Sequence, residues 1–137
     1  MTQTSSKPAQ RPAQTESITL DCDHILTYAG GDSGQLMQLC AAFLTELPMY
    51  TSEFANSFQR RETSAAERAV QNLRGCLRVF GTGPVIFTLE TLGYALLGGR
   101  RAQARREWLR LQRQLRALVP QVQRLMLEIS PPCGPVQ

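Results

Sequence analysis

The chain has 137 residues, of which 42% are hydrophobic and 19% are charged. This length allows one domain with a buried core and leaves too little chain for two. Aromatic residues make up only 7% while leucine and alanine are abundant, a composition that favours helices over strands. The formal charge of +4 comes largely from arginines between residues 100 and 116, so it is a local property.

The four cysteines stand far apart, and the chain contains one histidine. This pattern argues against a zinc site and against a disulfide framework, so we expect no metal and no cofactor. No run approaches the roughly 20 apolar residues needed to cross a bilayer, and the N-terminus lacks an apolar leader region. We therefore expect a cytoplasmic, reduced protein that does not interact with a membrane.

The predicted elements begin after a tail. Residues 1–17 and 130–137 are rich in small, polar or proline residues and are predicted to be disordered, which leaves residues 18–129 as one helical domain. A first helix is predicted over residues 21–28, with Asp21 as its N-cap. A second begins at Asp32 or Ser33, and Pro48 is predicted to separate it from a third that ends before the polar run 60–63.

The second half of the domain contains three more predicted helices. Ser64 is expected to cap the fourth, with Glu67 completing a capping box. Gly81-Thr82-Gly83 ends this helix, and a fifth runs from Pro84 to Gly98-Gly99. The last helix continues to residue 129, with Pro120 as a kink or break. The pattern predicts an all-α fold: an antiparallel four-helix bundle formed by helices three to six, with additional N-terminal helices packed across one end.

One face of the fourth helix carries polar side chains beside a buried seam. At about 100° per residue, the apolar seam passes through Val70, Leu73 and Leu77, and a polar column lies next to it. The column contains Glu67, Gln71, Arg74, Gly75 and Arg78. A glycine in mid-helix costs roughly 1 kcal/mol relative to alanine, so Gly75 needs a reason. Either a neighbouring helix packs closely against it, or a partner approaches there.

The segment Val70-Gln71-Asn72-Leu73-Arg74-Gly75-Cys76, followed by Phe80-Gly81, resembles the signature of histidine phosphotransfer domains. In that family a helix carries His-x-Leu-Lys-Gly-Ser and, a few residues later, a Leu-Gly pair. Upstream, Gly30-Gly31-Asp32 is similar to the family's Gly-Gly-Asp turn, and the resemblance covers roughly residues 20 to 127. In this alignment Gln71 stands at the position of the reactive histidine.

The resemblance implies a small helical bundle that works with receiver domains, whose aspartates exchange a phosphoryl group with the exposed histidine. An imidazole nitrogen has a free lone pair that can attack an acyl phosphate, whereas the lone pair of the Gln71 amide nitrogen is delocalised into its carbonyl. Phosphotransfer at Gln71 should therefore be absent. His24, the only histidine, lies outside the signature and is expected to be a capping or solvent-facing residue.

These observations predict a non-enzymatic, degenerate phosphotransfer protein. We expect it to bind the receiver domain of a response regulator or hybrid histidine kinase, as a competitor or adaptor, through Glu67, Gln71, Arg74, Gly75 and Arg78. A helical scaffold or assembly protein that uses another face is the alternative. The arginines of the last helix fit a solvated face or an acidic partner, and the lack of exposed aromatics among them argues against nucleic acid.

Overall fold

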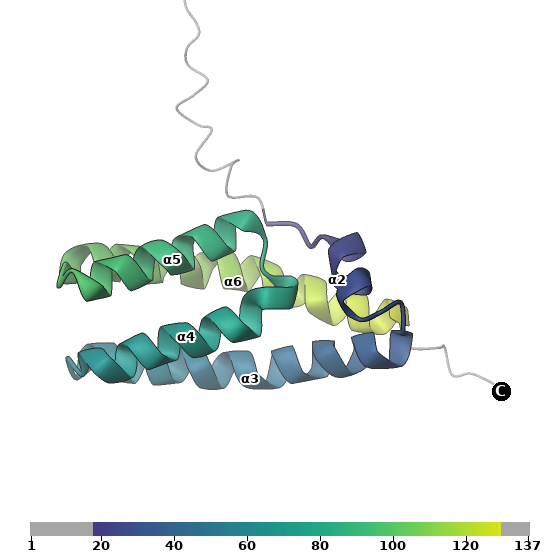
Figure 1. Ribbon diagram of the computed structural model, residues 1–137, viewed down its shortest axis with the longest axis horizontal. Coiled ribbons are helices and arrows are strands. Elements are labelled where there is room, and N and C mark those ends of the chain that lie inside the picture. Colours follow the sequence, from purple (N-terminus) through teal and green to yellow (C-terminus); the bar gives the residue numbers. More distant parts are fainter. Residues whose placement is uncertain (1–17, 130–137) are drawn as a thin grey trace, which may run out of the picture.

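A computed structural model describes residues 18–129, and within this range every regular element is an α-helix (Figure 1). The five helices are α2 (Cys22–Tyr28), α3 (Ser33–Gln59), α4 (Thr63–Phe80), α5 (Gly83–Leu97) and α6 (Arg101–Ile129). The all-α prediction is confirmed for these residues. The two predicted tails, residues 1–17 and 130–137, lie outside the described range.

The four long helices, α3 to α6, lie lengthwise beside one another, and the short α2 packs near one end (Figure 1). Helix α3 contacts α4 and α6, and α5 contacts the same two helices, so the four enclose a common core. The side chains at its centre, among them Phe54, Leu73, Leu89 and Leu111, have no exposed surface. Burial of these apolar stripes supplies most of the stability of such an arrangement.

The predicted break at Pro48 is wrong, because α3 runs without interruption from Ser33 to Gln59. A proline within a helix removes one backbone hydrogen bond and costs about 3 kcal/mol. Here the apolar stripe continues in phase on both sides of Pro48, through Leu47 and Phe54, which are buried. Losing either side chain from the core would cost as much or more. Pro120 likewise lies inside α6 and does not break it, with Val122 fully buried just beyond.

The predicted N-cap Asp21 and the predicted start of the next helix at Asp32 or Ser33 are confirmed, and the capping box is wrong. Asp21 accepts a hydrogen bond from the His24 N–H, and Asp32 accepts from the Gly34 and Gln35 N–H groups. Helix α4, however, begins at Thr63 with Glu62 as its cap residue, and this cap makes no side-chain hydrogen bond. The reason lies in the α3–α4 turn. The Glu62 carbonyl accepts the first helical hydrogen bond, from the Ala66 N–H at 2.9 Å. Ser64 therefore already lies inside the helix and cannot be its N-cap.

A side-chain clasp joins the first described residues to the last helix. The Gln121 amide nitrogen donates to the Ile18 carbonyl at 2.6 Å, and its oxygen accepts from the Leu20 N–H at 3.0 Å.

None of the helices between residues 18 and 129 combines the length and the apolarity that crossing a bilayer requires.

Candidate functional site

Helix α4 carries all five predicted site residues on the side that faces away from the core. Gln71, Gly75 and Arg78 are exposed, while Glu67 and Arg74 are half-buried. The adjacent seam residues Val70, Leu73 and Leu77 are buried, as the periodicity predicts. The structure therefore brings the polar column together as one solvent-facing strip.

Gly75 has no packing reason to be a glycine. A Cβ atom built on its backbone would meet no atom within 4 Å, so no neighbouring helix among the described residues fills that space. By contrast, a Cβ atom at Gly93 of α5 would lie 3.7 Å from the Val70 side chain, at the contact between the two helices. Of the two explanations for Gly75, close packing of a neighbouring helix is thus excluded within residues 18–129.

Arg74 is the second unusual residue of the strip. Its Nε atom is enclosed by protein and has no hydrogen-bond partner among the described residues. A buried donor without a partner costs about 1–3 kcal/mol. The exposed area of the residue belongs to its other atoms, and no described carboxylate pairs with its charge. Arg74 therefore presents an unneutralised cation beside Gln71.

Sequence reasoning missed a row of exposed hydrophobic side chains on α5. Phe87, Tyr94 and Leu97 are 64%, 65% and 70% exposed, although α5 buries Leu89 and Leu92 completely on its other side. Spacings of seven and three residues place the three on one helix face. The available signal was that α5 is apolar on both faces, which is unusual for a surface helix.

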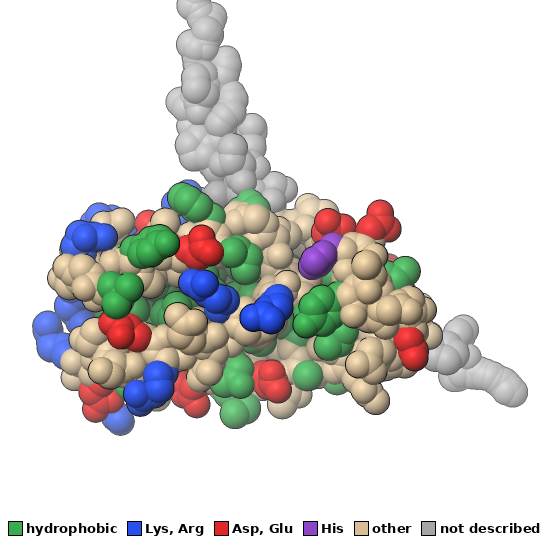
Figure 2. All heavy atoms as spheres, viewed as in Figure 1, with side chains coloured by type: hydrophobic (Ala, Val, Ile, Leu, Met, Phe, Trp, Pro, Cys, Tyr) green, Lys and Arg blue, Asp and Glu red, His purple; other side chains and the backbone are tan. Residues whose placement is uncertain are grey.

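The α5 row and the α4 column face the same side of the molecule. The two helices run in opposite directions (Figure 1) and touch where Gly93 meets Val70. In such a pair, the residue that follows each contact position is turned by about 100° toward the same side, so Gln71 and Tyr94 look in one direction. Figure 2 shows hydrophobic side chains along α5 and basic side chains between α4 and α5 on this side.

We call this combined surface the docking face. It consists of Glu67, Gln71, Arg74, Gly75 and Arg78 of α4 and of Phe87, Tyr94 and Leu97 of α5.

The histidine position of the docking face holds no nucleophile that could take a phosphoryl group from an acyl phosphate. Gln71 has no nucleophilic nitrogen. Burial, assisted by the nearby Glu46 carboxylate, raises the pKa of the Cys76 thiol to about 12, so this thiol stays protonated at neutral pH. His24 is exposed on α2, where its backbone N–H bonds to the Asp21 cap. Within residues 18–129 no three His, Cys, Asp or Glu side chains are grouped to hold a metal ion.

Comparison of the chain with protein-family models, with curated proteins and with solved structures gives no match. A function for the docking face therefore has to come from its own residues and from the signature-like segment in α4.

The arginine-rich helix α6 divides into exposed and anchored residues. Arg105, Arg106, Arg113 and Arg116 are exposed. Trp108 is buried and packs its ring 4.4 Å from that of Phe54, measured between centroids, so it belongs to the core. Arg101 instead reaches across to the end of α3, where it donates to the Phe58 carbonyl.

Proposed function

We propose that this protein is a non-catalytic pseudo-histidine-phosphotransfer protein. Its four long helices form the antiparallel bundle of that family, and its docking face binds the receiver domain of a response regulator or hybrid histidine kinase without relaying phosphate. The observation that carries the proposal is the exposed Gly75, because no contact within the described residues requires a glycine there. Gly75 lies beside Arg74, which no described carboxylate neutralises, and beside Gln71, which stands at the histidine position of the signature.

The composition of the docking face supports a protein partner with an acidic pocket. Arg74 and Arg78 supply positive charge, which complements the carboxylates of a receiver's phosphorylation pocket. Phe87, Tyr94 and Leu97 supply exposed apolar and aromatic area on the neighbouring helix α5. Aromatic side chains and arginine are the residues enriched where protein partners bind.

A glycine at position 75 fits this role because it leaves room for the partner's backbone to approach the helix. Gln71 fits it because a neutral amide can donate and accept hydrogen bonds where a phosphorylated histidine would add negative charge. Binding of the partner would therefore not be switched by phosphorylation at position 71. Such a protein acts as a competitor or an adaptor in the cytoplasm, where its free thiols Cys22, Cys40 and Cys76 stay reduced.

The test measures receiver binding and phosphate transfer together. Purified receiver domains are titrated into the full chain by calorimetry, and Arg74→Gln is compared with Arg113→Gln, which removes the same charge from exposed α6. We expect Arg74→Gln to weaken binding about tenfold, close to 1.4 kcal/mol, and Arg113→Gln to leave it unchanged. Receivers carrying labelled phosphate should transfer none to the chain. Equal losses in both variants, or acid-labile phosphate on the unmodified chain, would contradict the proposal.

A helical scaffold that uses another face remains the second candidate, favoured by a groove of about 400 Å³ between α3 and α6. Leu47, Pro48, Leu115 and Val119 line this groove and make it mainly apolar. In that case, partner binding would be indifferent to Arg74→Gln. Binding of nucleic acid by the α6 arginines would instead show a steep loss of affinity with salt.

A further inference from the structure

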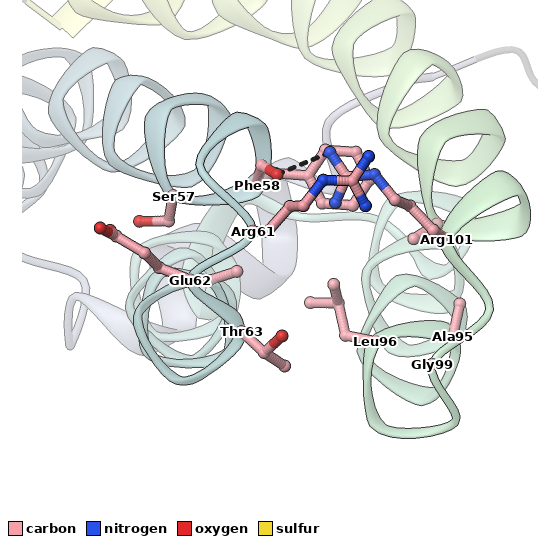
Figure 3. A pocket seen from close by; sticks show the side chains of 11 residues that line it. Ser57, Phe58, Arg61, Glu62, Thr63, Ala95, Leu96, Gly99 and Arg101 are labelled. Carbon is pink, nitrogen blue, oxygen red and sulfur yellow. Dashed lines mark hydrogen bonds between the residues drawn. The ribbon is translucent and has the colours of Figure 1, made fainter.

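A cavity of about 200 Å³ lies at the end of the four long helices where the α3–α4 turn meets the α5–α6 turn (Figure 3). Arg61 of the α3–α4 turn and Arg101 at the start of α6 line it together with the apolar side chains Ala66, Leu96 and Ala104. Thr63, also at the cavity, lies eight residues before Gln71, which corresponds to about 12 Å along α4. The cavity is thus separate from the phospho-acceptor position.

The Arg101 guanidinium is held in place before any ligand arrives. Its Nη2 atom donates to the Phe58 carbonyl at 2.7 Å. The guanidinium group also stacks over the Phe58 ring, with its Cζ atom 4.0 Å from the ring centroid. These contacts connect the start of α6 to the end of α3, 43 positions apart in the chain. Its other N–H groups have no partner among the described residues, so a fixed set of donors faces the turn region.

Arg61 occupies a backbone position that favours glycine. Its φ is 61°, in the left-handed region, and the turn closes through the hydrogen bonds Arg61 N–H to Phe58 carbonyl and Glu62 N–H to Ser57 carbonyl. Helices α2 and α5 end in the same kind of turn, with Gly30 and Gly99 at this position. Only α3 among these three has a side chain there, and that side chain is a cation.

The two guanidinium groups point toward one another (Figure 3). Desolvation lowers the pKa of Arg101 below the usual range for arginine, and the positive charges of Arg61 and Arg105 lower this pKa further. No described carboxylate pairs with either Arg61 or Arg101. Glu62 borders the cavity, but its carboxylate is turned away from both guanidinium groups (Figure 3). A dianion between the two groups would relieve their repulsion and could accept from both planar forks.

We propose that Arg61 and Arg101 form a binding site for a small phosphate monoester. The phosphate lies between the two guanidinium groups, and its organic substituent enters the cavity against Leu96, Ala66 and Ala104. Two observations favour a small ligand over an extended polyanion: the cations at the cavity are only two arginines, and most of the other lining residues are apolar, among them Ala66, Leu96 and Ala104. The site goes beyond the proposed docking function and is independent of it.

The experiment uses phenyl phosphate as the probe, with inorganic phosphate and phenol as partial probes. Each is titrated into the full chain at constant ionic strength, and the amide signals of Thr63 and Gly99, which line the cavity, are followed by NMR. We expect saturable shifts with phenyl phosphate, at least fivefold weaker binding of inorganic phosphate, and no saturable shift with phenol. Arg61→Gln should weaken phenyl phosphate binding at least tenfold.

The matched control is Arg60→Gln, because Arg60 is exposed in the same turn and does not line the cavity. It removes the same charge and should change affinity less than twofold. Equal losses in the two variants would overturn the site, as would an absence of saturable shifts or equal binding of inorganic and phenyl phosphate. If Arg61→Gln fails to fold, Arg61→Gly, which suits the left-handed backbone, provides the same test.

Discussion

Replacing Gly75 by alanine should make the free protein more stable and its complex weaker. The residue is exposed within α4, and the added methyl group would meet nothing within 4 Å, so no strain offsets the gain in helix propensity. That gain is about 1 kcal/mol, which corresponds to roughly 4 °C in Tm for a domain of this size. On the docking face, the same methyl group would stand between α4 and a closely packed partner, where overpacking costs about 1–3 kcal/mol.

The Gly75→Ala variant should therefore show a higher free energy of unfolding and a lower affinity for its partner. Urea unfolding followed by circular dichroism gives the stability, and calorimetric titration with a receiver domain that binds the unmodified chain gives the affinity. Asn72→Ala is the control, because Asn72 is exposed in the same helix but lies outside the docking face. It should gain a few tenths of a kcal/mol and bind normally. A destabilised Gly75→Ala protein would show that the glycine has an internal role, and unchanged affinity would show that no partner uses the space.

Three further changes test other parts of the structure. Arg61→Gly should raise the free energy of unfolding by about 1 kcal/mol in urea titrations, and a fall would mean that the arginine side chain stabilises the turn. Pro48→Ala should stabilise by about 2 kcal/mol, from a helix penalty near 3 offset by a more flexible unfolded chain; a loss would show that α3 requires the proline. Because Cys76 has a raised pKa in the folded state, about 12 against an ordinary 9, the unfolded chain loses this proton first. Its contribution to stability is present below pH 9 and declines as the pH rises toward 12. Between pH 8 and pH 10, the free energy of unfolding should therefore fall less for Cys76→Ala than for the unmodified protein. An equal fall in the two proteins would refute the role given to the Cys76 thiol.

The core of the domain could be predicted from the sequence because apolar spacing reports burial directly. Val70, Leu73 and Leu77 follow the helical period and are buried, and Trp108 lies in the core as its spacing predicts. The polar face of α4 follows from the same geometry. Local rules failed where tertiary packing overrode them. At Pro48 the propensity rule predicts a break, whereas the apolar stripe on either side keeps α3 continuous.

Two features of the candidate sites depend on which residues meet in space. Arg61 and Arg101 are 40 positions apart, and only the meeting of two turns brings them to one cavity. The sequence could not show that Phe87 and Tyr94 are exposed, because α5 is apolar on both faces. Periodicity alone does not tell which of two apolar faces packs against the core. A single sequence reports the pattern along each helix and contains little information about which helix covers it.

The prolines of α3 and α6 have a dynamic consequence. Pro48 and Pro120 line the same groove, so α3 and α6, although continuous, each contain a proline at a common level. Because proline has no N–H, the carbonyls of Leu44 and Arg116 lack their backbone donors there. Local opening requires the fewest broken hydrogen bonds at this level, and amide exchange should be fastest in the adjoining turns. Helices α3 and α6 would then open locally at this shared level, and the segments on either side of the two prolines would fluctuate separately.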